Sequence, residues 1–239
     1  MQADFVQSPK ACFVRCFLKK GAFMKGYRIS LIRHGLTEAN EKGIYIGRTD
    51  LPLSNKGASE LCAKMDEFDY PIVHKVYSSP LRRCTETAEL LFPCTQMCVV
   101  DDLRELDMGT FENKSVHELI KDEDYQTWIK GGPDTRPPGG ESLQELTART
   151  YKALHEIITD MMNEGLTHCA VITHSGIISN MMACFGLPKY DPKQLTPAPG
   201  EGFEIIVTTS MWLNSQAFEI LGIVPYEKLP ETEDYTFSE

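Results

Sequence analysis

The chain has 239 residues, 42% of them hydrophobic, and a formal net charge of -10 at neutral pH. This length and apolar content suffice for one large α/β domain with a substantial core. Such an acidic chain repels DNA, RNA and anionic membrane surfaces, which argues against a general role in binding any of them.

The eight cysteines do not follow the spacing of a disulfide framework or a zinc site. Cys12 and Cys16 are separated by three residues, as are Cys94 and Cys98, and no CxxC motif occurs. Free thiols are therefore expected, and with them a cytoplasmic location. No stretch approaches the roughly 20 apolar residues of a membrane-spanning helix. We expect a disordered extension over residues 1–24, one domain over 25–226 and an acidic flexible tail over 227–239.

Short β-rich runs alternate with longer helical runs along the chain. Strands are predicted at 27–33, 74–78, 97–100, 168–173, 203–209 and 217–224. Helices are predicted at 54–68, 80–92, 115–122, 142–164 and 175–185. This alternation predicts a three-layer α/β/α fold with a mostly parallel sheet covered by helices on both faces. The last two strands, with no predicted helix between them, are expected to form an antiparallel pair at the edge of the sheet.

Two of the predicted strands end in similar polar sequences. Strand 27–33 leads into His34 and Gly35, and strand 168–173 leads into His174, Ser175 and Gly176. The carboxyl ends of parallel strands meet at one edge of a sheet, where ligands bind. The two histidines are therefore expected to lie together, each close to a helix N-terminus that favours an anion.

The strand at 74–78 leads to Arg82 and Arg83 in the first turn of a helix. The helix dipole disfavours cations at that end, so an arginine there makes sense if it faces a bound anion. Guanidinium groups bind phosphate with planar, bidentate geometry. Either arginine alone would be ordinary surface, but the combination with the strand-end histidines predicts a phosphoryl site. Arg33 and Arg83 would repel a divalent cation, so neither a metal nor another cofactor is expected.

Five segments of the chain resemble, in order, the signatures of the histidine phosphatase superfamily in its phosphoglycerate-mutase-like branch. They are LIRHGLTEAN (31–40), SSPLRRCTETAELL (78–91), LRELDMGTFEN (103–113), PPGGESLQEL (137–146) and VITHSG (171–176). The resemblance covers roughly residues 27 to 185. It implies the three-layer α/β fold already predicted and a reaction that passes through a phosphohistidine.

The resemblance also implies a role for each catalytic candidate. His34 would be the nucleophile, and Arg33 and Arg83 would bind the phosphoryl oxygens. His174 would be the second pocket histidine, and Glu105 would exchange protons with the leaving group and with water. Arg82 is left as a residue of the rim.

Further residues are expected to line the substrate pocket. Thr37 and Asn40 match the family's polar wall, and Gly35 is a further expected substrate contact. Gly47 is expected to turn backbone N–H groups toward the ligand. Tyr45, Arg48, Trp128 and the loop at 196–202 are candidate substrate contacts, although the three side chains fit packing or surface positions equally well. The chain departs from the family at Cys84, where alanine is usual, and at Glu112-Asn113, where Glu-Gly is frequent.

Three functions remain open from the sequence. The first is a metal-independent phosphatase acting on a small phosphorylated metabolite, such as α-ribazole phosphate or a sugar or glycerate phosphate. The second is a phosphoglycerate mutase, although mutases of this branch typically carry Glu-Ser after Arg-His-Gly, where this chain has Leu36-Thr37. The third is a non-catalytic module that binds phosphorylated partners, which the presence of the full catalytic set disfavours. The oligomeric state is left open, a homo-oligomer included.

Overall fold

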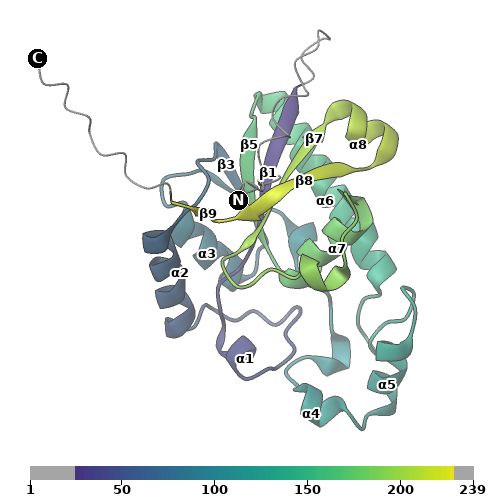
Figure 1. Cartoon of the computed structure of the whole chain (residues 1–239). Helices are drawn as coiled ribbons and strands as arrows, with labels where there is room; N and C mark the ends of the chain where they lie inside the picture. Colours follow the sequence, from purple (N-terminus) through teal and green to yellow (C-terminus); the bar gives the residue numbers. More distant parts are fainter. Residues whose placement is uncertain (1–24, 229–239) are drawn as a thin grey trace, which may run out of the picture.

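The computed structural model describes residues 25–228, and the predicted extension and most of the predicted tail lie outside that range (Figure 1). Its central sheet has the strand order β4-β3-β5-β1-β7-β8-β6. The strands are β1 (Gly26–Arg33), β3 (Lys75–Ser78), β4 (Met97–Val99), β5 (His168–Thr173), β6 (Gly186–Leu187), β7 (Gly202–Thr208) and β8 (Phe218–Val224). Two short strands, β2 (Phe68–Asp69) and β9 (Tyr226–Glu227), pair separately.

The sheet is mostly parallel, as predicted. The pairs β4/β3, β3/β5, β5/β1 and β6/β8 are parallel, whereas β7 runs antiparallel to both β1 and β8. The helices are α1 (Glu38–Glu41), α2 (Asn55–Glu67), α3 (Arg82–Leu91), α4 (Val116–Leu119), α5 (Glu123–Lys130), α6 (Leu143–Glu164), α7 (Ser175–Phe185) and α8 (Thr209–Ser215). Within the described residues, 3₁₀ turns occupy Asp101–Leu103, Gly109–Phe111 and Pro192–Leu195.

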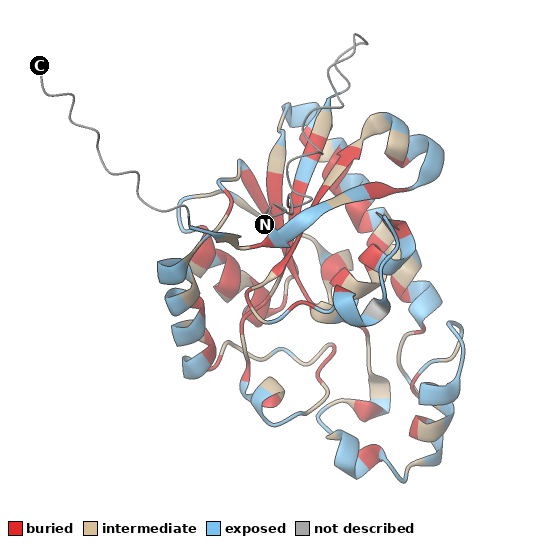
Figure 2. Cartoon of the chain, viewed as in Figure 1, coloured by how far each residue is buried: buried red, intermediate tan, exposed pale blue. Residues whose placement is uncertain are grey.

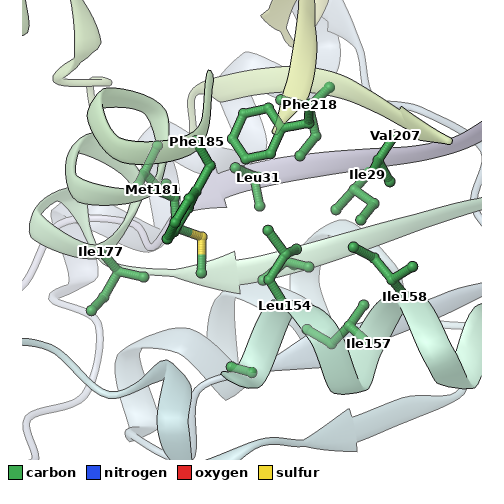
Figure 3. Packing of buried hydrophobic residues seen from close by; sticks show 14 of the residues in the cluster. Ile29, Leu31, Leu154, Ile157, Ile158, Ile177, Met181, Phe185, Val207 and Phe218 are labelled. Atoms are coloured by element: carbon green, nitrogen blue, oxygen red, sulfur yellow. The ribbon is translucent and has the colours of Figure 1, made fainter. Parts of the chain in front are cut away.

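Both faces of the sheet are buried because successive side chains of a strand point to opposite sides. In β1, Ile29 and Leu31 pack against α6 and α7, whereas Ile32 packs against α2 and α3. Figure 3 shows Leu31 on the side of Phe185 and Met181 of α7, and Ile29 on the side of Ile158 of α6. The continuous apolar runs of β1 and β5 follow from this double coverage, and Figure 2 shows the buried strands at the centre of the molecule.

The end of the chain differs from the prediction in two respects. The strands β7 and β8 do pair antiparallel, but α8 connects them and β6 lies beyond β8, so β8 is not the edge strand. The seven residues of α8 are too few to show a helical period; the helix is defined by the Thr208 cap and by Trp212, which is buried against Tyr151 and Phe185. Glu227 pairs with Phe68, one residue beyond the predicted domain boundary.

The segment between Glu105 and α6 contains two helices instead of the single one predicted at 115–122. Ser115 and Glu118 form a capping box, but α4 ends at Leu119 and Asp122 caps a new helix, α5. With α1, these helices lie below the sheet in Figure 1. Within residues 25–228, no helix combines the length and apolar character that crossing a bilayer requires.

Candidate active site

Three adjacent strands of the sheet deliver polar side chains to one edge. Arg33 of β1 lies opposite Thr173 of β5, so the following residues, His34 and His174, leave the sheet side by side. The His34 backbone N–H donates to the Thr173 carbonyl oxygen at 3.0 Å. On the other side of β5, the backbone N–H of Ser79, which follows β3, donates to Ile172 at 3.0 Å. The parallel register therefore places the three strand ends around one point.

The two histidine rings lie together, away from solvent. Their centroids are 5.2 Å apart in an edge-to-face arrangement. His34 is 5% exposed and His174 is fully buried. The structure thus brings together two residues that are 140 positions apart in the chain.

The protonated nitrogen of His34 follows from its hydrogen bond. Nδ1 lies 2.6 Å from the carbonyl oxygen of Gly35. A carbonyl oxygen can only accept, so Nδ1 carries the proton of the neutral ring and Nε2 is left with its lone pair. Gly35 is held in turn by its own N–H, which donates to the Thr87 hydroxyl at 3.0 Å.

The ring of His174 is also held by both nitrogens. The Nε–H of Arg83 donates to Nδ1 at 3.3 Å, which assigns the ring proton to Nε2. Nε2 lies 2.9 Å from the hydroxyl oxygen of Ser79 and 3.5 Å from the sulfur of Cys84. The cysteine that replaces the family's usual alanine therefore touches this histidine, and burial raises the pKa of its thiol, which stays neutral.

The two arginines adjacent in sequence have different environments. Arg83 is fully buried, and its terminal nitrogens donate to the carbonyl oxygens of Thr49 at 2.8 Å and Gly47 at 2.9 Å. Arg82 is exposed and pairs with Glu86 one helical turn away. The structure therefore places Arg83 inside the site and Arg82 at the surface.

Arg33 approaches the site from the end of β1. Its terminal nitrogen donates to the carbonyl oxygen of Pro197 at 2.9 Å, in the loop at 196–202. Its Nε–H is buried and has no hydrogen-bond partner among the described residues. A buried guanidinium donor left in this way is suited to an anionic ligand.

Glu105 supplies a carboxyl group beside this positive cluster. Its two oxygens accept from the backbone N–H of Leu106 at 2.9 Å and of Gly176, in the first turn of α7, at 3.2 Å. Burial raises the pKa of Glu105, while these hydrogen bonds and the charges of Arg83 and Arg149 oppose that rise. A raised pKa makes the carboxyl easier to protonate, as suits a group that gives and takes a proton.

The electrostatics keep both histidines neutral. Burial and the charges of Arg83 and Arg33 lower the pKa of His34 to about 3, against the opposing effect of the hydrogen bond to Gly35. Burial, then His34 and Arg83, lower the pKa of His174 well below its ordinary value. Burial and the nearby guanidinium charges thus act in the same direction, against a positive charge on His34.

The low pKa of His34 predicts a loss of stability in acid. The unfolded chain takes up a proton on His34 below pH 6.5, whereas the folded chain does not until about pH 3. Between pH 6.5 and about pH 3, protons bind more readily to the unfolded chain than to the folded one. The stability that the neutral His34 contributes above pH 6.5 is therefore lost as the pH falls through this range. His34 alone contributes up to about 1.4 kcal/mol per pH unit to the loss.

The contribution of His34 is measurable by urea unfolding between about pH 7 and about pH 5. We expect the unfolding free energy of His34→Gln to depend less steeply on pH than that of the unchanged protein. His117→Gln, at an exposed histidine of α4, is the matched control and should leave the slope unaltered. Equal slopes for the unchanged protein and His34→Gln would contradict the assignment of a buried, neutral His34.

Comparison with known proteins agrees with the fold and the motifs. The family model described as histidine phosphatase superfamily (branch 1) matches residues 29–207. This chain belongs to that superfamily. A probable phosphoglycerate mutase, GpmB, of Salmonella choleraesuis is 28% identical over 193 residues, which cover 79% of this chain and 88% of the relative.

Solved structures of other proteins share the architecture. A putative alpha-ribazole-5'-P phosphatase from Escherichia coli has a TM-score of 0.69 at 21% identity, over 85% of this chain and 99% of the other. A phosphoglycerate mutase from Bacillus anthracis has a TM-score of 0.63 at 18% identity, over 83% and 93%. At these identities the likeness shows the fold alone.

In this superfamily member, Gly47 binds a protein side chain through the backbone N–H that was predicted to face the substrate. The Gly47 N–H was expected to face a ligand, but it donates to the carboxylate of Glu112 at 3.0 Å. The Gly47 carbonyl, not its N–H, points to Arg83. A side chain at position 47 would meet the Leu106 carbonyl oxygen at 1.9 Å, so the close approach of two backbones explains the glycine.

Thr37 and Asn40, the polar residues predicted to line the pocket after His34, form the capping box of α1. The hydroxyl of Thr37 accepts from the Asn40 N–H at 3.3 Å, and the Asn40 side-chain oxygen accepts from the Thr37 N–H at 3.2 Å. Thr37 is fully buried and Asn40 is partly exposed. Of this pair, the NH₂ group of Asn40 is the donor suited to reach an anion.

The aromatic candidates Tyr45 and Trp128 contribute to packing. The Tyr45 hydroxyl lies 3.0 Å from that of Tyr125, and the Tyr45 ring contacts Trp128. Together with Phe111 these side chains form a small core that joins α4 and α5 to the segment before Gly47. Arg48 lies between Asp107 and Glu141, with nitrogen to oxygen distances of 3.9 Å and 3.8 Å.

Sequence reasoning missed Arg149 of α6. Its guanidinium donates to the carbonyl oxygens of Glu105 at 3.0 Å and Asp102 at 2.7 Å, and pairs with Glu141. It therefore supports the backbone that carries Glu105. A signal existed, because Arg149 lies three residues after Leu146 and four before Ala153, on the buried face of the helix.

Proposed function

We propose that this superfamily member is a phosphomonoester hydrolase that moves the phosphoryl group of a small metabolite to His34 and then to water. The observation that carries the proposal is the state of His34, a buried neutral ring with its proton on Nδ1 and its lone pair on Nε2. Arg83, Arg33 and His174 are the groups around it. A neutral imidazole beside fixed positive charges is suited to attack a phosphate dianion.

In the first step, Nε2 of His34 attacks phosphorus and the bond to the ester oxygen breaks. Glu105, in its protonated form, gives its proton to the departing alkoxide, so the alcohol leaves neutral. The hydrogen bond from Nδ1 to the Gly35 carbonyl oxygen holds the ring in the reactive tautomer. The carbonyl dipole also stabilises the positive charge that develops on the ring. Arg33 and Arg83 stabilise the charge on the phosphoryl oxygens.

In the second step, the phosphohistidine is hydrolysed. The ionised Glu105 takes a proton from water while the water oxygen attacks phosphorus. The bond between phosphorus and Nε2 breaks, inorganic phosphate forms, and both His34 and Glu105 return to their starting states. In this proposed cycle the chain supplies the nucleophile, the positive charges and the proton carrier, so no metal is called for.

A phosphoglycerate mutase is the second candidate, favoured by the name of the curated relative at 28% identity. In a mutase the phosphohistidine returns its group to a rearranged substrate instead of water. Leu36-Thr37-Glu38-Ala39 resembles the phosphatases of the branch, which supports hydrolysis here. The substrate proposal is correspondingly broad: α-ribazole phosphate, a sugar phosphate or a glycerate phosphate.

One assay separates the candidates. The purified protein is incubated with each of these phosphate esters, and inorganic phosphate and isomerised phosphoglycerate are measured together. We expect phosphate release, with the largest kcat/KM identifying the substrate class. Isomerised phosphoglycerate without phosphate release would establish a mutase, and a folded protein that does neither would contradict both proposals.

A further inference from the structure

The carboxylate of Glu112 occupies a site made of backbone amides. It accepts hydrogen bonds from three consecutive N–H groups, those of Gly47 at 3.0 Å, Arg48 at 2.7 Å and Thr49 at 3.3 Å. The Thr49 hydroxyl donates a fourth at 2.6 Å. Burial acts to raise the pKa of Glu112, but these hydrogen bonds outweigh it and lower the pKa below its ordinary value. The group is therefore an internal anion at neutral pH.

Two of these three residues also hold the guanidinium of Arg83 on their other side. The carbonyl oxygens of Gly47 and Thr49 accept from its two terminal nitrogens at 2.9 Å and 2.8 Å. The Gly47 carbonyl and the Arg48 N–H belong to one planar trans peptide, in which the two groups point in opposite directions. That peptide is consequently fixed between Glu112 on one side and Arg83 on the other.

The orientation of this peptide has an electrostatic consequence. If it flipped, an N–H group would face the Arg83 guanidinium and a carbonyl oxygen would face the Glu112 carboxylate, both repulsive. The loop cannot move aside easily either, because Gly47 lies against the backbone of Leu106, next to Glu105. The Glu112 carboxylate is the group that determines which way the peptide faces.

The left-handed residue after Glu112 supports the same arrangement. Asn113 has a φ of 62°, a conformation that glycine and asparagine adopt most readily. The side chain of Asn113 donates to the Thr49 hydroxyl at 3.2 Å, and its N–H donates to the Tyr45 carbonyl at 2.9 Å. Asparagine therefore suits the turn that the family frequently makes with glycine, and the turn directs Glu112 into the amides.

We propose that Glu112 is a positioning residue for the phosphoryl site: it orients the 47–49 loop, whose carbonyls align the Arg83 guanidinium. This inference rests on the proposed function, in which Arg83 binds the phosphoryl group. Glu112 does not touch the reacting atoms. It acts through the Gly47–Arg48 peptide and Arg83, whose Nε–H in turn orients His174.

The first test removes the carboxylate. Displacing a positioned group by about 1 Å can cost about 10²-fold in rate, so we expect Glu112→Ala to lower kcat/KM by about that factor. Because Arg83 would bind phosphate less well, inhibition by inorganic phosphate should weaken as well. Glu118→Ala is the matched control, since Glu118 also caps a backbone N–H in this region, at Ser115, but is exposed and part of α4. It should leave both readouts unchanged.

The second test restores the anion. Glu112→Ala leaves three converging N–H groups and space for a small carboxylate, so added formate should recover part of the lost kcat/KM. Formate should not accelerate the unchanged protein or Glu118→Ala. A purely structural loss of folding would not respond to formate in this way.

The third test asks whether Glu112 acts through Arg83. In an Arg83→Ala background, adding Glu112→Ala should cost little further activity, because residues that act through one another are not additive. Full additivity in this cycle, or no formate recovery in a folded Glu112→Ala, would overturn the inference.

A failure of folding does not leave the proposal untested. If Glu112→Ala does not fold, Glu112→Gln replaces it: glutamine keeps the size of the side chain but turns an NH₂ group toward the amide donors. Inhibition by inorganic phosphate must then weaken in Glu112→Gln for the proposal to stand.

A failure of this proposal can be told apart from a failure of the proposed function. An unchanged protein that turns over no phosphate ester refutes that function, whereas an active protein whose Glu112 variants behave normally refutes only the role of Glu112.

Discussion

His34→Ala is expected to lower kcat/KM for phosphate ester hydrolysis by about 10⁴-fold or more, because it removes the nitrogen that attacks phosphorus in the proposed cycle. The Nε2 lone pair exists because Nδ1 is committed to the Gly35 carbonyl. Alanine offers no substitute, and Arg33 and Arg83 would then bind phosphate without a nucleophile beside it. The rate is measured as inorganic phosphate release from the best substrate of the panel.

Two further measurements make this result specific. The unchanged protein, given a ³²P-labelled ester and quenched with alkali, should retain label that is lost in acid, as expected of phosphohistidine. His34→Ala should retain none. His117→Ala, at an exposed histidine of α4, serves as the control and should keep both activity and labelling. Normal turnover by folded His34→Ala would refute the proposed mechanism.

Glu105→Gln is expected to slow turnover by about 10²- to 10⁴-fold, the usual scale of general acid–base catalysis. Glutamine keeps the size of the side chain, and its one oxygen can still accept from the Leu106 or the Gly176 amide, although not from both. It cannot donate a carboxylic proton to the alkoxide or take one from water. Glu89→Gln, on the exposed side of α3, is the control.

Two measurements distinguish the proposed roles of Glu105 as a general acid in the first step and a general base in the second: one varies the leaving group and the other varies the pH. With an aryl ester such as p-nitrophenyl phosphate, the p-nitrophenolate leaves without protonation. Glu105→Gln should therefore form phosphohistidine at a near-normal rate and then stall. We expect a burst of p-nitrophenol followed by slow turnover.

With an alkyl ester, activity of the unchanged protein should fall as the pH rises through the raised pKa of Glu105, since the protonated acid is then lost. This fall in activity at high pH should be absent in Glu105→Gln. If the fall remained, another group would be the acid.

The strand ends were predictable because their chemistry is local. Arg33-His34-Gly35 and His174-Ser175-Gly176 interrupt apolar runs, and the parallel order of β1 and β5 then brings them together whatever the details of packing. Choosing Arg83 over Arg82 required the family motif, since composition and helical position treat the two alike. Burial separates them in the structure, with Arg83 fully enclosed.

The errors lie where long-range contacts decide a short segment. The helix α8 is too short for its period to be visible, and it forms because Trp212 finds a buried site against Tyr151 of α6. Likewise the Gly47 N–H could serve a ligand or a protein carboxylate equally well in sequence terms. Its actual partner, Glu112, lies 65 residues further along the chain.

By itself, then, the sequence determined the alternating strands and helices, the edge of the sheet where polar groups gather, and the residue types able to carry a phosphoryl group. Those properties follow from hydrophobic period and side-chain chemistry, which each residue carries with it. Only the tertiary structure decided the proton positions on His34 and His174, the enclosure of Arg83 and the direction of the Gly47–Arg48 peptide. They depend on which donors and acceptors meet across the fold, and on how much water is excluded where they meet.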